Sequence, residues 1–305
     1  MNKTVPLVSI MIPVYNRESI ISETLECAIN QTYKNIEIIV SDNCSTDETW
    51  VVLQKFAAKD SRIKIFQNTV NVGPVLNWKR CINEASGEYA KILFSDDLIS
   101  NNFIEETLSD FDQHTSFVIS AIKIFDEENI KDFFPLTNKK IYSSNEFIRD
   151  LVIYNKNNFP VSPGCAIFRT EDLKNNLIID IENPFSIDFK ILGAGNDLLL
   201  LLLSSKSNKY IKINTNSHSF FRHHEGSFTV ANKLTEYYDF AKYFFIKYQA
   251  VELFSKFKTS LWLRGLKNEK RNRVYDLIVK RINIPFLFVL ILIRIRFFLV
   301  NLKNK

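Results

Sequence analysis

IEIIVSDNCSTDET, residues 36–49, contains the parts of a βα unit in order. The apolar run 36–41 is typical of a strand buried on both faces, and the polar run after it is typical of a loop. Apolar residues then recur with helical spacing from Val51 to Ala57. Asp42 stands where the strand ends. The stretch therefore predicts a buried strand that delivers a carboxylate to a loop, followed by a covering helix.

Three further apolar runs, residues 7–12, 62–66 and 89–94, resemble the run at 36–41. Segments with helical periodicity, such as 20–29, separate them. Alternating strands and helices predict an α/β fold with a mostly parallel central sheet that has helices on both faces. In such sheets ligands bind beyond the carboxyl ends of the strands.

Polar residues follow each predicted strand, in the segments 13–17, 41–49, 68–73 and 95–97. We expect these segments to meet at one edge of the sheet. Part of their polarity has a structural explanation, since residues 45–47 can cap the following helix. The adjacent carboxylates Asp96 and Asp97 repel each other, and a hard divalent cation such as Mg²⁺ or Mn²⁺ would offset that repulsion.

The second half of the sequence is less regular. It predicts a strand at 164–169, a buried helix at 196–205, strands at 209–213 and 218–224, and an amphipathic helix at 233–248.

The composition is that of an ordinary globular protein, with 46% hydrophobic and 24% charged residues, which excludes a disordered chain. Cys27, Cys44, Cys81 and Cys165 lack zinc-site spacing and are expected to be reduced thiols in a cytosolic protein. Polar residues interrupt the apolar N-terminal run too early for a signal peptide.

Residues 256–305 hold 13 Lys and Arg against two acidic residues, which leaves the rest of the chain mildly acidic. Such a segment suits an anionic membrane surface or a nucleic acid, or forms a solvated helix. Within it, the apolar run 283–300 is interrupted by Arg294 and Arg296, so it is too short for a membrane span. It fits a helix that lies in the membrane interface; the alternative is a helix packed on the body or on a second subunit.

Five stretches together resemble the inverting, metal-dependent family 2 glycosyltransferases with the GT-A fold, in particular the bacterial enzymes of O-antigen and capsule synthesis. They are VSIMIPVYNR, IEIIVSDNCSTDET, NVGPVLN, ASGEYAKILFSDD and GNDLLLLL, within residues 7–230. The resemblance implies a catalytic domain at 1–230, with a nucleotide-sugar half to about residue 115 and an acceptor half from 116. Residues 231–305 are expected to form a helical, membrane-associating region.

The resemblance also implies roles for residues of the first half. Pro13, Val14 and Tyr15 would line the nucleoside pocket, Asp42 would bind the base, and Asn71 would contact the nucleotide sugar. Asp96 would lie near the ribose or diphosphate, and Asp97 would bind the cation. Phe94 replaces the first aspartate that is common in this motif, which favours Asp97 as the main protein ligand.

In the second half, Asp197 matches the family's general base, a carboxylate that accepts the proton of the acceptor hydroxyl. Helix capping is the structural alternative for Asp197, and Asn196 replaces the family's usual acid. Arg222 would neutralise the diphosphate and His224 would join the metal, although the neighbouring His223 is close in sequence.

The resemblance, together with the basic segment 256–305, implies transfer of a sugar from a nucleotide-diphosphate sugar to a lipid-linked glycan, with inversion, at the inner face of the bacterial cytoplasmic membrane. Nucleic acid is not an expected partner. The rival hypotheses are a nucleotidyltransferase, a metal-dependent phosphohydrolase, a non-catalytic binding protein that keeps the fold, and a nucleic-acid binder that uses the basic segment. The sequence has neither a phosphate-binding glycine loop nor the dense histidine-aspartate cluster that the two rival enzymes would use.

Overall fold

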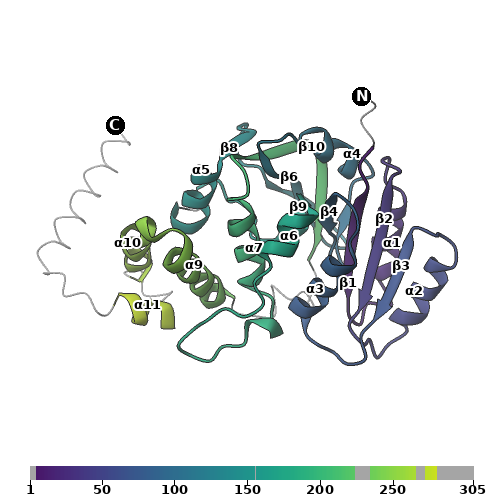
Figure 1. Ribbon diagram of the computed structural model, residues 1–305, viewed down its shortest axis with the longest axis horizontal. Coiled ribbons are helices and arrows are strands. Elements are labelled where there is room, and N and C mark those ends of the chain that lie inside the picture. The colour runs from purple at the N-terminus through teal and green to yellow at the C-terminus, as the bar shows by residue number, and fades with distance from the viewer. Residues whose placement is uncertain (1–4, 155, 224–233, 266–271, 280–305) are drawn as a thin grey trace, which may run out of the picture. The chain divides into compact units, whose positions relative to one another are not determined.

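A computed structural model describes residues 5–154, 156–223, 234–265 and 272–279, called the described residues below. The chain divides into two compact units, Met1–Phe254 and Ser255–Lys305. Within the described residues, the first unit contains a 10-stranded sheet with helices on both faces (Figure 1). The second unit contains most of α10 (Phe254–Gly265) and α11 (Arg273–Ile278).

The first half of the sheet is parallel. Its strands lie in the order β3 (Ile63–Gln67), β2 (Ile36–Asp42), β1 (Val8–Val14) and β4 (Tyr89–Ile92). Every residue of β1 and β2 is buried, which explains their continuous apolar sequences. The four strands predicted from the sequence are confirmed, although β4 ends at Ile92, two residues before the predicted end.

Helices cover both faces of these strands (Figure 1). One face carries α1 (Ile21–Ile29), α2 (Thr49–Ala57) and α4 (Phe103–Ser109), whose apolar side chains form one core with β1 and β2. The other face carries α3 (Pro74–Glu84), and α6 (Thr170–Asn176) packs beside it. Next along the same layer, α7 (Asn196–Ser204) packs between α6 and α9 (Thr235–Gln249).

The second half of the sheet is mixed. The strand β9 (Ala166–Arg169) runs antiparallel to both of its neighbours, β4 and β6 (Thr115–Phe125). The strand β10 (Tyr210–Arg222) is parallel to β6. Three short antiparallel strands complete the sheet: β5 (Leu98–Ile99), β7 (Ile130–Phe134) and β8 (Ile141–Ser143). The predicted mostly parallel arrangement therefore holds for the first half, whereas the second half has one parallel pair, β6 and β10, among antiparallel ones.

Two predicted strands have different limits in the structure. The strand predicted at 164–169 begins only at Ala166, because Pro163–Cys165 form a 3-10 turn. The strands predicted at 209–213 and 218–224 are one strand, β10, with an irregularity between Asn214 and His218. There the Asn214 side chain accepts hydrogen bonds from the backbone of Asn216 and Ser217, which holds the extra residues in place.

The remaining elements are short. They are α5 (Ser144–Arg149), a π-helical turn (Asp150–Tyr154) and 3-10 turns at Phe189–Ile191 and Val251–Leu253. All four cysteines are free, as predicted. No helix formed by the described residues is long and apolar enough to cross a membrane. The apolar run 283–300 lies outside the described residues.

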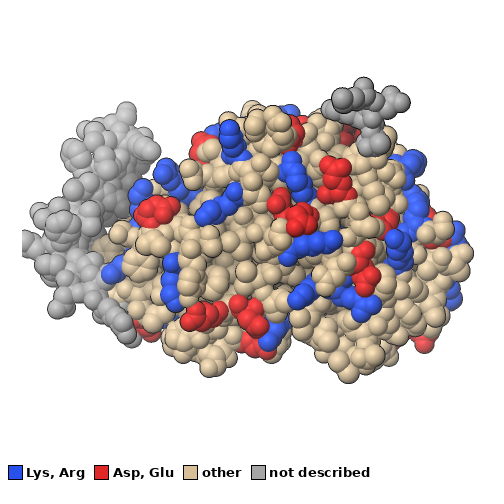
Figure 2. Space-filling model, in the orientation of Figure 1, with Lys and Arg blue, Asp and Glu red and all other residues tan. Residues whose placement is uncertain are grey.

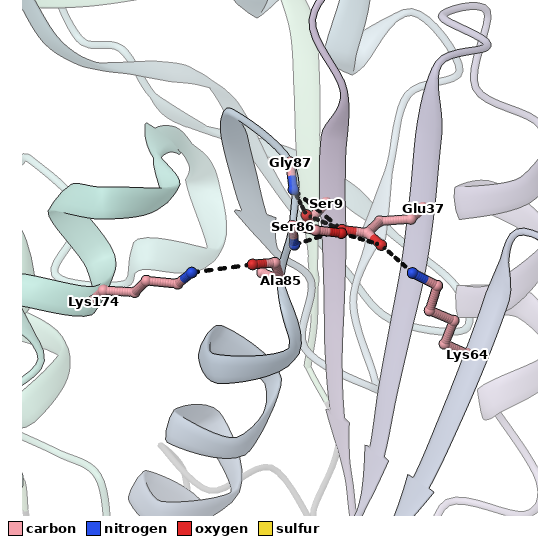
Figure 3. Close-up of polar contacts among 7 residues, drawn as sticks. All are labelled: Ser9, Glu37, Lys64, Ala85, Ser86, Gly87 and Lys174. Carbon is pink, nitrogen blue, oxygen red and sulfur yellow. Dashed lines mark hydrogen bonds and ion pairs between the residues drawn. The ribbon is translucent and has the colours of Figure 1, made fainter.

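A buried carboxylate joins β1, β2, β3 and the segment before β4, as Figure 3 shows. Glu37 of β2 accepts hydrogen bonds from Ser9 Oγ at 2.7 Å and from the amides of Ser86 at 2.8 Å and Gly87 at 3.2 Å. It also forms an ion pair of 2.7 Å with Lys64 Nζ. Burial opposes the charge, but these partners outweigh it and lower the pKa of Glu37 to about 2.

The visible surface of the described residues carries charges of both signs. Figure 2 shows Lys and Arg side chains interspersed with Asp and Glu over the sheet and its covering helices. No extended region of one sign is seen on this face of the described residues. A strong basic field is therefore not a property of the face in view.

Candidate functional site

The polar segments after β1 and β2 are bound to each other at the carboxyl edge of the sheet. Val14 lies opposite Asp42 in the register, so the two strands end level. Beyond them, Asn16 N donates to Ser45 Oγ at 2.9 Å, and Arg17 N donates to Thr49 Oγ1 at 2.8 Å. The predicted convergence of these two segments is confirmed.

The three residues for which capping was the alternative have separate roles. Ser45 binds the backbone of Asn16, and Thr46 N donates to Asn16 Oδ1 at 2.9 Å. Asp47 accepts from Thr49 N at 3.0 Å, in the first turn of α2. Asp47 also accepts from Glu18 N at 3.2 Å, so all three residues join the segments and only Asp47 serves the helix end as well.

The predicted nucleoside-binding residues lie together at the ends of β1 and β2. Pro13 and Val14 are buried, whereas Tyr15 is 38% exposed and available to a ligand. Asp42 is fully buried, and its carboxylate accepts from Ser45 N at 3.2 Å and from Gln67 Nε2 at 2.9 Å. Binding of a base by Asp42 stays a prediction, and it would require one of these partners to share the carboxylate.

A group of asparagines holds the segment after β3 against β2. Asn71, a predicted ligand residue, is exposed and accepts from Asn43 Nδ2 at 2.8 Å. Asn68 donates to both Asn43 and Asn77, each at 3.1 Å. Asn77 in turn donates to the Ser41 carbonyl at 2.9 Å. Asn43 and Asn77 were not singled out from the sequence, where they resemble ordinary loop and helix residues.

Asp96 and Asp97 lie between two arginines. Arg17 Nη2 is 3.5 Å from Asp96 Oδ2, and Arg222 N donates to Asp97 Oδ1 at 3.1 Å. Arg222 Nε also donates to the Asp96 carbonyl at 3.0 Å. Burial and then the Asp96 carboxylate raise the pKa of Asp97 well above its ordinary value. The repulsion predicted from the sequence is therefore present despite the arginines.

Arg222 reaches this pair from the end of β10. Its Nη2 forms an ion pair of 2.6 Å with Glu23 of α1, and its guanidinium lies 4.6 Å from the centroid of the Phe125 ring. His223 is exposed and its amide donates to the Phe125 carbonyl at 2.7 Å. His224, the predicted second metal ligand, lies outside the described residues. Among the described residues no group of three or more His, Cys, Asp and Glu could hold a metal.

Lys91 is a buried charge that interacts electrostatically with Asp97. It lies on β4, its Nζ donates to the Gly164 carbonyl, and the Phe103 ring centroid is 4.5 Å away. Burial lowers the pKa of Lys91 to about 8, and the charge of Asp97 opposes that shift. Lys91 was not predicted as a site residue, although a lysine within the apolar run 89–94 is a signal for a buried charge.

Asp197 lies in the first turn of α7. Its Oδ1 accepts from the amides of Gly195 at 2.8 Å and Leu198 at 2.6 Å, and its Oδ2 accepts from the Tyr238 hydroxyl at 3.1 Å. Burial raises the pKa of Asp197 to about 7. Asp197 therefore binds helical amides, as the capping alternative requires, and is also close to half-ionised at neutral pH, as a general base requires.

Trp78 connects the Asp96–Asp97 segment with the segment before Asp197. Its ring centroid lies 5.6 Å from that of Phe94. On the other side it lies against Gly193, where an added Cβ would come within 2.7 Å of the indole and where φ is +69°. The segments leading to the carboxylate pair and to Asp197 thus border the same aromatic side chain.

Comparison with known proteins identifies the family. The model of the family described as glycosyl transferase family 2 matches residues 9–177. The chain belongs to this family. An Escherichia coli relative, UDP-Glc:alpha-D-GlcNAc-diphosphoundecaprenol beta-1,3-glucosyltransferase WfaP, is 31% identical over 75% of this chain and 82% of its own length.

Other relatives match shorter stretches. An uncharacterized glycosyltransferase of Haemophilus influenzae is 38% identical over 34% of this chain. The chain spans only 42% of the length of that protein and 58% of a second one from the same organism.

The solved structure of S. aureus TarS residues 1–349 with UDP-GlcNAc shares the fold. It superposes with a TM-score of 0.58 at 21% identity, over 89% of this chain and 70% of that one. The GT-A fold and the family resemblance predicted from the sequence are therefore confirmed.

Proposed function

We propose that this protein transfers a sugar from a nucleotide-diphosphate sugar to a hydroxyl of a lipid-linked glycan, with inversion at the anomeric carbon. The observation that carries the proposal is that Phe94, just before the carboxylate pair, and Gly193, just before Asp197, both lie against Trp78. A carboxylate with a pKa of about 7 on one side suits proton abstraction. A carboxylate pair flanked by arginines on the other side suits a diphosphate and its cation.

The carboxylate pair fits a divalent cation. Mg²⁺ and Mn²⁺ prefer oxygen ligands and are commonly held by one or two carboxylates together with substrate phosphates. The raised pKa of Asp97 reflects a charge that burial and Asp96 leave uncompensated, and a cation would compensate it. Asp97 is the proposed ligand, with Asp96 beside it and His224 as a second candidate. When bound, the cation supplies positive charge to the diphosphate.

The chain's own residues have distinct proposed roles in donor binding. Pro13, Val14 and Tyr15 line the nucleoside pocket together with Asp42 and Asn71. Arg222 would bind the diphosphate through its guanidinium and give up its ion pair with Glu23. The buried Nε of Arg17 has no hydrogen-bond partner among the described residues, so it is available to donate a hydrogen bond to an oxygen of the nucleotide sugar.

The transfer itself is a single displacement. Asp197 accepts the proton of the acceptor hydroxyl as the acceptor oxygen forms its bond to the anomeric carbon. The bond from that carbon to the diphosphate breaks, and its electron pair leaves on the diphosphate oxygen. Attack from the face opposite the leaving group inverts the anomeric centre.

The proposed acceptor follows from the names of two relatives, and the proposed location follows from the basic segment 256–305. WfaP and a Campylobacter jejuni relative are named for undecaprenol-linked acceptors, which supports a role in O-antigen, capsule or related surface polysaccharide synthesis. The basic segment 256–305 would hold the protein at the inner face of the cytoplasmic membrane. Binding of the full chain to anionic vesicles and not to neutral ones would support that location; equal binding to both would contradict it.

Substitution of the proposed base tests the reaction. Asp197→Asn should lower turnover by at least about 1,000-fold while UDP binding changes less than about twofold, because the carboxamide keeps the shape but cannot take the proton. Release of nucleoside diphosphate is measured with a panel of nucleotide sugars and an undecaprenyl-diphosphate-linked sugar. Retained turnover would show that Asp197 is not the base.

A further inference from the structure

Tyr238 links α9 to the proposed base. It lies beyond residues 9–177, the part of the chain that the family model matches. Its hydroxyl donates to Asp197 Oδ2 at 3.1 Å, and α9 packs along α7. On the helical face next to it, Tyr237 packs edge-on against Phe189, with ring centroids 5.4 Å apart. The helix is therefore also fixed on the body directly beside the Tyr238 contact.

We propose that Tyr238 is a positioning residue for sugar transfer, which orients the Asp197 carboxylate and leaves Oδ2 as the oxygen that receives the acceptor proton. The inference rests on the proposed function of Asp197. It adds a residue that neither the family match nor the sequence pattern assigns to the site.

The hydrogen bonds around Asp197 distinguish its two oxygens. A carboxylate oxygen has two lone-pair positions. Oδ1 uses both, on the amides of Gly195 and Leu198. Oδ2 uses one, on Tyr238, and keeps the other. The acceptor proton can therefore move only to Oδ2 without breaking an existing hydrogen bond.

Tyr238 acts as a donor and is not itself a base. Burial and then the Asp197 charge raise the pKa of the Tyr238 hydroxyl far above its ordinary value, so it stays protonated. A permanent donor stabilises the ionised carboxylate against the burial that disfavours it. Removal of the hydroxyl should therefore raise the pKa of Asp197 further.

The other titratable groups near α7 do not replace this effect. The elements packed against α7 are α6, α9 and the turn Pro163–Cys165. Besides Tyr238, the titratable side chains of these elements are Cys165, Glu171, Asp172, Lys174, Glu236, Tyr237, Asp239, Lys242, Tyr243, Lys247 and Tyr248. The main influences on the pKa of Asp197 are burial, neighbouring amides and Tyr238, and none of these other groups is among them.

The pH profile of Tyr238→Phe tests the inference. The change keeps the ring and removes the hydroxyl, and one hydrogen bond to a charged acceptor corresponds to a shift of about one pH unit. The acidic limb of the kcat/KM profile should shift by about one unit to higher pH. The value of kcat/KM should therefore fall about tenfold at pH 6 and less than about twofold at pH 9. Tyr237→Phe is the matched control, and its limb should coincide with that of the wild type.

A direct titration separates positioning from folding. In protein labelled with ¹³C at the aspartate carboxyls, the Asp197 resonance is identified by its absence in Asp197→Asn, and its pKa should rise in Tyr238→Phe. If Asp197→Asn is inactive while the limb and the NMR pKa of Tyr238→Phe equal those of the wild type, this inference alone is wrong. If Asp197→Asn retains turnover, the proposed base is wrong and the inference fails with it.

Discussion

Replacement of Glu37 by glutamine should destabilise the first half of the sheet at neutral pH. Glu37 is 5% exposed and accepts from Ser9, Ser86 and Gly87 while it pairs with Lys64 (Figure 3). A glutamine side chain has the same length, but its NH₂ group can only donate. The NH₂ group would therefore face the N–H and O–H groups that now donate to a carboxylate oxygen. The ion pair with Lys64 would also be lost.

The pKa of Glu37 gives the size of the effect. The pKa falls from 4.5 to about 2 on folding. At 1.36 kcal/mol per unit, this difference corresponds to about 3 kcal/mol of stability for the ionised form. Because the folded pKa is the lower one, that stability is fully present above pH 4.5 and is lost as the pH falls toward 2. Lys64 is half exposed, so solvent screening reduces its share and about 2–3 kcal/mol is expected.

Urea unfolding at several pH values measures this effect. Glu37→Gln should unfold about 2–3 kcal/mol more easily than the wild type at pH 7, and the difference should shrink as the pH approaches 3. Glu84→Gln is the control, since Glu84 only pairs with Arg80 on the surface of α3, and it should cost less than about 0.5 kcal/mol. A Glu37→Gln cost no larger than the control, or one that does not change with pH, would refute the reasoning.

Three further predictions concern the site. The kcat/KM for transfer should rise about tenfold per pH unit below pH 6 and level off above about 7, as Asp197 loses its proton; a flat profile from pH 5 to 8 would contradict a base with this pKa. Gly193→Ala should lower kcat by more than about tenfold and the melting temperature by a few degrees, because an added methyl group collides with Trp78 at a positive φ. Removal of divalent cations with EDTA should weaken UDP binding, measured by calorimetry, by about tenfold or more, and Mn²⁺ or Mg²⁺ should restore it; unchanged binding would argue against a cation at Asp97.

The first half of the fold could be predicted because its signals are local. β1, β2 and most of β4 are buried on both faces, so each appears in the sequence as a short apolar run, whereas the edge strand β3 is only partly buried. Polar residues follow directly, and the level register of Val14 and Asp42 brings them together. Resemblance to the family supplied the roles, but the convergence of the segments follows from strand order alone.

The second half could not be predicted in the same way because its pairing is non-local. β6 is almost wholly buried, yet its run from Thr115 to Phe125 includes two serines and was not recognised as a strand. Those serines are satisfied by distant groups, since Ser116 donates to the Ser205 carbonyl and Ser120 binds Ser219. The local sequence does not predict partners that are so distant along the chain. The contact of Tyr238 with Asp197 was missed for the same reason, because helical periodicity places a tyrosine on a face without naming its partner.

Phe94 shows how a departure from the family pattern can have a structural reason. A carboxylate at this position would add a third negative charge beside Asp96 and Asp97, where the pKa of Asp97 is already raised. The phenyl ring instead packs against Trp78, and Gly164 approaches it so closely that an added Cβ would come within 2.9 Å. Gly164 also provides the carbonyl that binds the buried Lys91. Phe94 therefore belongs to the apolar support beneath the carboxylates, and that support extends through Trp78 to the segment that carries Asp197.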